Sequence, residues 1–292
     1  MEIELSKEVL HLLDRLKFTP RIKTQRRLAG RHASPLAGGS PDFLEYREYS
    51  AGEKAADIDW RASAKGDRLL VRKREHQGLI QHWLVLDGSA SMEFPHPEES
   101  KRRAQLLIAG ALTHFLSGQG DAVGLLIEKE GGAIEHLAPR RTREGLAELI
   151  RRASAQPPVR AAPALPAALK ILAEMLRSPA VVWAMTDFAD APGPALTELA
   201  HLAAAGHDVR VLHLAHPFEE RPPWGGDCLL RDPEDAIPER RLHLEDLLRE
   251  YSETYARHCE AIARALRNAG ALYDRLEVTR PLEEILTLIL EV

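Results

Sequence analysis

From about residue 80 onward, short apolar stretches alternate with longer segments whose apolar positions recur every three or four residues. The short stretches have the length and composition of buried strands, and the longer ones have the period of amphipathic helices. We therefore predict strands at 81–86, 121–128, 133–137, 180–186, 208–214 and 271–277. We predict helices at 101–117, 142–153, 165–176, 194–205, 242–269 and 281–290.

Strands that alternate with helices pair in parallel, with helices covering both faces of the sheet. We expect a doubly wound, mostly parallel α/β sheet, in which residues 133–137 return as the hairpin partner of 121–128. In a sheet of strand order 3-2-1-4-5-6, the first strand (81–86) lies beside the fourth (180–186). Ligands bind at such a switch point, beyond the carboxyl ends of the strands.

The first 79 residues lack this alternation. Residues 6–16 form an amphipathic pattern typical of a helix, 29–40 are rich in Gly, Ala, Ser and Pro, and 69–75 weakly predict a strand. We interpret residues 1–79 as an irregular N-terminal extension packed on an α/β domain of residues 80–292. A second irregular insertion is expected at 217–238.

Composition narrows the function classes. The chain has 292 residues, of which 45% are hydrophobic and 28% charged, as in ordinary globular proteins. The net charge of −5 argues against general nucleic-acid binding. The N-terminus lacks a signal-peptide pattern, no apolar run reaches the roughly 18 to 20 residues of a membrane span, and the cysteines, Cys228 and Cys259, are few. We expect a cytoplasmic protein without a membrane span.

Candidate chemistry lies where the first predicted strand ends. Asp87, Ser89 and Ser91 follow that strand at alternate positions, so their side chains can converge on one point. Oxygen donors of this kind suit a hard cation such as Mg²⁺. The simpler interpretation is a turn with a helix cap, because Asp, Gly and Ser commonly follow strands.

A second carboxylate favours the cation. Asp187 follows the strand at 180–186, which the expected topology places beside 81–86. Two strands distant in sequence would then each deliver an aspartate to the same place. We therefore predict a metal site made of Asp87, Ser89, Ser91 and Asp187, holding Mg²⁺ or Mn²⁺.

These residues resemble a known family. Asp87-x-Ser89-x-Ser91 and Thr186-Asp187-Phe188 are similar to the metal-ion-dependent adhesion site of von Willebrand factor type A domains, which are Rossmann-like. Other segments resemble the bacterial domain-of-unknown-function family 58, namely Tyr46-Arg47-Glu48-Tyr49, Gly52-Glu53, Ile58-Asp59-Trp60-Arg61-Ala62-Ser63-Ala64, Tyr255-Ala256-Arg257-His258 and Thr279-Arg280-Pro281-Leu282-Glu283. The resemblance implies a non-enzymatic protein-binding module and a MoxR-type AAA+ ATPase as partner in complex assembly or chaperone-like work.

One residue departs from the resemblance. The adhesion site takes a further ligand from a threonine, and Pro163 stands in its place, which leaves no hydroxyl. The chain has no phosphate-binding Gly-x-x-x-x-Gly-Lys-Ser/Thr loop, so the ATPase would be another protein. Two alternatives stay open: a metal-dependent hydrolase using Asp87 and Asp187, and a metal-free scaffold.

Overall fold

The computed structural model describes residues 5–22, 45–48, 63, 69–73, 80–128, 133–141, 151, 153, 165–189, 192–230, 239–243 and 247–290. The chain divides into two compact units, one of residues 1–23 and 80–292 and the other of residues 24–79. Residues 1–23, which the sequence analysis grouped with the extension, thus belong to the same unit as the α/β domain. In the second unit, β1 (Glu45–Glu48) pairs antiparallel with β2 (Leu70–Lys73).

A six-stranded sheet in the order β10-β7-β6-β3-β4-β5 forms the centre of the larger unit. All neighbours in it are parallel except β4 and β5, which form the predicted antiparallel hairpin. The strands are β3 (Gln81–Leu86), β4 (Ala122–Glu128), β5 (Ile134–Arg140), β6 (Val181–Thr186), β7 (Asp208–Ala215) and β10 (Leu272–Glu277). Numbered along the chain, this is the predicted order 3-2-1-4-5-6, and the fold prediction is confirmed.

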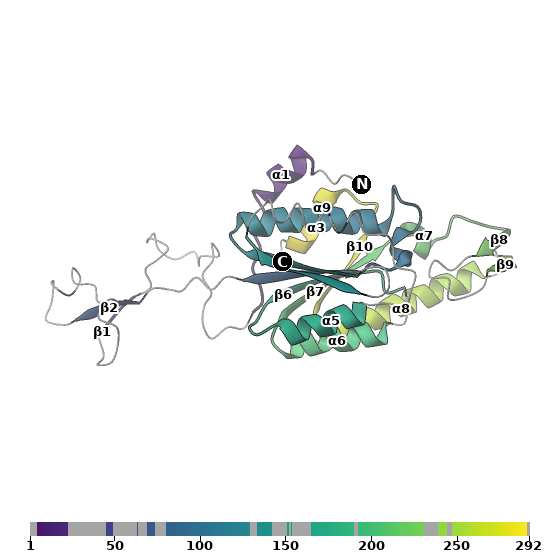
Figure 1. Cartoon of the computed structure of the whole chain (residues 1–292). Helices are drawn as coiled ribbons and strands as arrows, with labels where there is room; N and C mark the ends of the chain where they lie inside the picture. The colour runs from purple at the N-terminus through teal and green to yellow at the C-terminus, as the bar shows by residue number, and fades with distance from the viewer. Residues whose placement is uncertain are drawn as a thin grey trace. The chain divides into compact units, whose positions relative to one another are not determined.

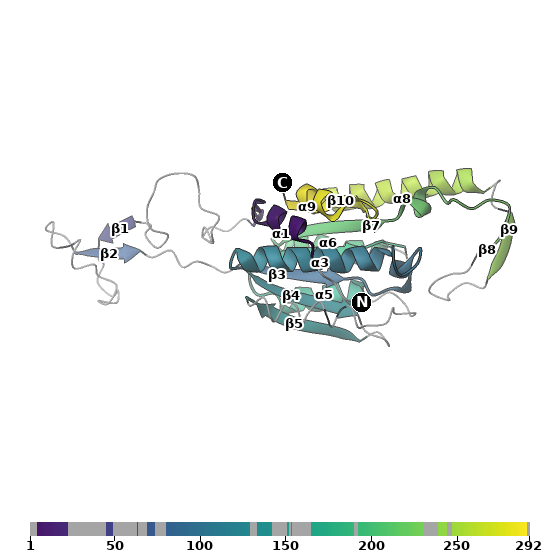
Figure 2. The same ribbon diagram turned by 90° about the horizontal axis from the view of Figure 1, so that it is seen from above.

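Helices cover both faces of this sheet, as a doubly wound fold requires (Figure 1). One face carries α1 (Lys7–Leu13), α3 (Lys101–Gly118) and α9 (Leu282–Leu290), which contact one another. The other face carries α5 (Leu165–Met175), α6 (Gly193–Ala204) and α8 (Leu248–Asn268). Seen from above in Figure 2, α3 lies along β3 and β4.

The helix boundaries follow local signals in the sequence. The Ser100 hydroxyl caps α3 by accepting a hydrogen bond from the Arg103 amide at 3.2 Å. Gly206 and Gly270 follow α6 and α8 with φ angles of 90° and 82°, a left-handed conformation that side chains disfavour. The predicted start of α8 at 242 was wrong, because residues 240–243 form β9 (Arg240–His243), an antiparallel partner of β8 (Asp227–Leu230). The insertion expected to be irregular also contains a short helix, α7 (Pro217–Glu220).

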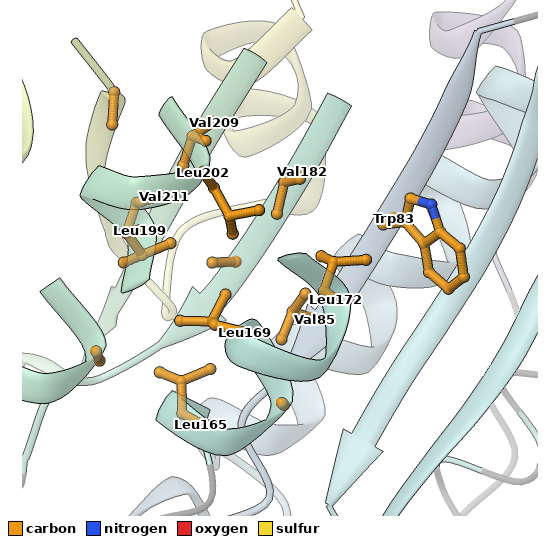
Figure 3. Packing of buried hydrophobic residues seen from close by; sticks show 14 of the residues in the cluster. Trp83, Val85, Leu165, Leu169, Leu172, Val182, Leu199, Leu202, Val209 and Val211 are labelled. Atoms are coloured by element: carbon orange, nitrogen blue, oxygen red, sulfur yellow. The ribbon is translucent and has the colours of Figure 1, made fainter. Parts of the chain in front are cut away.

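The hydrophobic core beneath α5 and α6 is built from alternate residues of the central strands. Trp83 and Val85 of β3 and Val182 of β6 point to this face, where they meet Leu169 and Leu172 of α5 (Figure 3). All five side chains are at most 3% exposed. Continuous apolar strands are expected when a parallel sheet is covered on both faces.

A group of buried polar residues lies near the amino-terminal ends of the strands. Arg210 of β7 forms an ion pair with Asp208 at 3.2 Å, and its guanidinium lies 4.4 Å from the ring centre of Phe18. His82 of β3 lies 3.2 Å from Asp121 and accepts a hydrogen bond from the Trp183 indole. We refer to His82, Asp121, Trp183, Asp208 and Arg210, with Phe18, as the amino-end network.

Candidate functional site

Asp87 and Asp187 lie side by side at the carboxyl edge of the sheet. β3 and β6 are neighbours in parallel, with Leu86 opposite Met185, so the residues that follow both strands emerge together. The strand order reverses here, since the chain continues from β3 to β4 on one side and crosses to β6 on the other. This edge is where doubly wound sheets bind ligands.

The Asp87 carboxylate is held by both of its oxygens. Oδ1 accepts a hydrogen bond from the Ser89 amide at 2.9 Å, and Oδ2 accepts one from the Thr186 hydroxyl at 2.5 Å. The Gln105 amide of α3 donates to the carbonyls of Asp87 and Met185, at 3.1 and 3.0 Å, and so fixes the ends of both strands. Thr186 and Gln105 position the aspartate; Thr186 was quoted in the family motif without being given a role, and Gln105 was not predicted to contribute to the site.

Gly88 is required by the close approach of the next strand. A β-carbon added there would lie 3.1 Å from the Glu128 β-carbon and 3.2 Å from its carbonyl oxygen, at the end of β4. Such contacts are tighter than carbon atoms ordinarily allow. The absence of a side chain at Gly88 leaves room for the end of β4 beside the segment that carries the two serines.

Ser89 and Ser91 join the two aspartates. Their hydroxyl oxygens lie 3.0 Å apart, and the Ser91 hydroxyl forms a hydrogen bond with Asp187. Asp87, Ser91 and Asp187 are each 6 to 7% exposed, so the cluster is buried. The structure thus brings all four predicted residues together.

The turn after β6 has an unusual backbone. Phe188 has a φ angle of 50°, in the left-handed region, although it is a bulky residue whose side chain is buried. Its amide donates to the Thr186 hydroxyl, and the next amide, that of Ala189, donates to Asp187 Oδ1 at 3.0 Å. Such a conformation costs on the order of 1–3 kcal/mol and persists where its surroundings impose it, often at functional sites.

Lys101, the first residue of α3, is the largest omission of the sequence analysis. Its ammonium donates to Asp187 Oδ2 at 2.6 Å and also to Glu219 of α7, and the side chain is fully buried. A signal for it exists in the sequence, because a lysine in the first turn of a helix opposes the helix dipole unless carboxylates lie close by. Glu219 could not be found in this way, since it lies in a segment predicted to be irregular.

The pKa values of the two aspartates are shifted in opposite directions. Burial raises the pKa of Asp87, and the negative charge of Asp187 raises it further. Burial also opposes ionisation of Asp187, but the charge and hydrogen bond of Lys101 outweigh it and lower the pKa of this carboxyl. The two carboxyls therefore influence each other's ionisation, with Lys101 next to Asp187 and the Arg102 guanidinium within Coulombic range of Asp87.

The donor set fits a small divalent cation in part. The Ser89 and Ser91 hydroxyls are hydrogen-bonded to each other at 3.0 Å, a separation that adjacent ligands of octahedral Mg²⁺, each at about 2.1 Å, would also have. The structurally described residues contain no group of three or more His, Cys, Asp or Glu side chains placed to hold a metal. Any cation here would depend on the hydroxyls together with Asp87 and Asp187. Pro163 lies outside the described residues.

A partly exposed aromatic cluster lies beside these residues. The rings of Phe94, His216, Phe218 and Trp224 pack edge to face with centres 4.7 to 6.1 Å apart. The Lys101 ammonium lies 5.7 Å from the centre of the Phe94 ring, which connects the cluster to the site. Trp224 is 44% exposed. Large aromatic side chains of this kind dominate the binding energy of many protein interfaces.

Within the described part of the chain, no helix is both long enough and apolar enough to cross a membrane.

Comparison with known proteins agrees with the family resemblance. An uncharacterised protein of Mycobacterium tuberculosis is 28% identical over 261 residues, which cover 88% of this chain and 80% of that protein. Among solved structures, BatB from Bacteroides thetaiotaomicron, described as a conserved hypothetical protein, has a TM-score of 0.46 and 15% identity, covering 72% of this chain and 96% of BatB. The SpRpn10 VWA domain has a TM-score of 0.41 and 8% identity, covering 72% of this chain and 94% of that domain.

The family itself is shown by sequence. Residues 45–261 match the family described as protein of unknown function DUF58. The match includes β3, β6, α3 and α7, which together carry the candidate site. The chain belongs to this family.

Proposed function

We propose that the chain is a non-enzymatic protein-binding module that binds its partner through a divalent cation at the carboxyl edge of the sheet. The observation that carries the proposal is the convergence of Asp87, Ser89, Ser91 and Asp187 from two adjacent strands. A cation between two carboxyls that repel each other would favour the ionised form of both. A simple turn and helix cap would not explain a second buried aspartate from another strand.

Each residue of the proposed site has a distinct part. The Ser89 and Ser91 hydroxyls offer neutral oxygens at the separation that Mg²⁺ needs. Asp87 and Asp187 supply negative charge, and Thr186, Gln105 and Lys101 hold them in place. When bound, Mg²⁺ or Mn²⁺ would supply the positive charge that attracts a carboxylate of the partner.

The aromatic cluster supplies the remaining binding surface. The centre of the Phe94 ring lies 5.7 Å from the Lys101 ammonium and the ring packs against Trp224, so a partner carboxylate followed by apolar side chains would reach the proposed cation and then this cluster. A central aromatic anchor beside a polar contact is typical of interface hot spots. The resemblance to domain-of-unknown-function family 58 makes a MoxR-type AAA+ ATPase the partner to test first.

The test is binding of a purified MoxR-type AAA+ ATPase from the same organism, with Mg²⁺ and with a chelator. Asp87→Ala and Asp187→Ala should each weaken the complex at least about tenfold, equal to about 1.4 kcal/mol, and chelation should weaken the wild-type complex similarly. Trp224→Ala should weaken binding in both conditions. Asp14→Ala, at an exposed aspartate that follows α1, is the matched control.

Survival of the complex through both aspartate substitutions and chelation would contradict the cation-bridged module. The metal-free scaffold would instead show no heat on titration with Mg²⁺ or Mn²⁺. The hydrolase built on Asp87 and Asp187 would show turnover of generic phosphate or ester substrates that Asp87→Asn abolishes. A hydrolase would also need a general base. Among the described residues Glu219 lies near the site, but its carboxylate accepts hydrogen bonds from Lys101 and from the His216 amide.

A further inference from the structure

The position of Lys101 is electrostatically unfavourable for a lysine. Its ammonium is fully buried and lies in the first turn of α3, where the helix dipole repels a positive charge. Burial of an unpaired ammonium is strongly unfavourable, so the Asp187 and Glu219 carboxylates must offset both effects. Hydrophobic residues in the same space would stabilise a fold at least as well.

The ammonium connects the candidate site to α7. Glu219 binds Lys101 with Oε1 and accepts a hydrogen bond from the His216 amide with Oε2, at 2.8 Å. His216 in turn caps α7 by accepting a hydrogen bond from the Phe218 amide at 3.1 Å. His216 and Phe218 both belong to the aromatic cluster that contains Trp224. A continuous path of contacts therefore runs from Asp187 through Lys101 and Glu219 to the aromatic cluster.

The ammonium also occupies the space and charge that a divalent cation would use. It lies 2.6 Å from Asp187, whose carboxylate also bonds to Ser91, one of the two serines with the spacing of metal ligands. A cation bound between the serines would lie a few ångströms from a buried ammonium, where charges repel strongly. The two positive charges must share the Asp187 carboxylate.

We propose that Lys101 is a positioning residue, an internal cation that competes with a divalent cation for Asp187 and transmits its binding to α7 and the aromatic cluster. The proposal rests on the cation site of the proposed function. Binding of the divalent cation draws Asp187 away from Lys101, which shifts Glu219 and with it the start of α7. The aromatic surface offered to the partner then depends on whether the cation is bound.

The first test is calorimetric titration of Mn²⁺ into the whole chain and into Lys101→Met. Removal of the ammonium should tighten Mn²⁺ binding about tenfold or more, whereas a purely structural lysine would leave the affinity unchanged or weaken it. Glu219→Gln keeps the contact between Lys101 and Asp187 and should not tighten binding. Lys170→Met, at an exposed lysine of α5, is the matched control.

The outcomes separate this proposal from the proposed function. If wild type binds Mn²⁺ and folded Lys101→Met binds it equally or more weakly, the competition is wrong and the cation site stands. If neither protein binds Mn²⁺, both proposals are wrong. If only Lys101→Met binds it, the competition is supported and the cation-bridged function fails. Should Lys101→Met not fold, Lys101→Met with Glu219→Gln, which removes one carboxylate together with the ammonium, is titrated instead.

A second measurement tests the transmission to α7. The emission of Trp224, taken as the difference between wild type and Trp224→Phe, should change when Mg²⁺ is added. This change should be lost in Lys101→Met and in Glu219→Gln, because each breaks the path between Asp187 and α7. No change in wild type, or the same change in both variants, would overturn the transmission.

Discussion

Buried charged residues occur at both ends of the parallel strands, and the two groups differ in how their charges are balanced. In the amino-end network Asp208 forms an ion pair with Arg210, and Asp121 is hydrogen-bonded to the His82 ring. At the carboxyl edge, Asp187 and Glu219 both accept hydrogen bonds from the Lys101 ammonium, and Asp87 lies close enough to Asp187 for that charge to raise its pKa. The ion pair of Asp208 and Arg210 is thus one to one, whereas at the carboxyl edge two carboxylates share one ammonium.

The contacts of Arg210 show how the amino-end network is held together. Arg210 lies over the rings of Phe18 and Trp183, at 4.4 and 5.2 Å from their centres, and donates to the Thr19 carbonyl. These contacts attach the N-terminal segment to the sheet. Because Asp208 and Asp121 both have hydrogen-bond partners within the protein, we interpret this end as structural.

The carboxyl edge shows the opposite. Its geometry is equally well defined, with Asp87 and Asp187 each fixed by hydrogen bonds, yet burial and like charge raise the pKa of Asp87. A protein gains no stability from keeping such a group, and functional sites are where unfavourable groups are retained. Buried charge alone does not identify a binding site, so the proposal rests on the repulsion between Asp87 and Asp187 at the carboxyl edge.

The largest effect on stability should follow from removing the Arg210 charge from the amino-end network. Arg210→Met should lower the free energy of unfolding by about 3–5 kcal/mol, because Asp208 would stay buried without its partner. Urea denaturation measures the change, and Mn²⁺ affinity should stay as in wild type. A loss below about 1 kcal/mol, the value of an ordinary exposed ion pair, would show that the pair of Arg210 and Asp208 does not stabilise this end of the sheet as expected.

The next effect concerns pH. Burial lowers the pKa of His213 from 6.5 to about 4, and the ring is edge-on to Phe188 beside the site. The unfolded chain takes up this proton first as pH falls, so stability should be lost between about pH 6.5 and pH 4 and fall no further from this group below it. The loss amounts to about 3 kcal/mol at 1.36 kcal/mol per pKa unit.

His213→Asn provides the control for that prediction, because asparagine does not titrate and its amide can still bond to the Tyr273 hydroxyl, 2.7 Å from the histidine ring. Denaturant midpoints between pH 4 and 7 should fall less steeply in this variant. An identical slope in wild type and variant would assign the acid sensitivity to other groups.

The sequence was sufficient for the sheet and for the four residues of the site. The strand order followed from the alternation of elements, and it placed Asp187 next to Asp87 before any contact was known. Lys101 and Glu219 were missed because burial of a long charged side chain depends on tertiary packing and leaves little periodic signal. The aromatic cluster was also missed, since Phe218 and Trp224 lie in the segment 217–238 that was expected to be irregular and His216 directly precedes it.

The most direct test of the central claim is the stability of wild type and Asp87→Asn, measured by urea denaturation in chelator and in Mg²⁺. In chelator, Asp87→Asn should be about 1 kcal/mol more stable than wild type, because it removes a buried, repelled charge at a functional site. Mg²⁺ at 100 times its dissociation constant should stabilise wild type by about 2.7 kcal/mol and leave Asp87→Asn unchanged. A variant less stable than wild type in chelator, or one equally stabilised by Mg²⁺, would contradict the account.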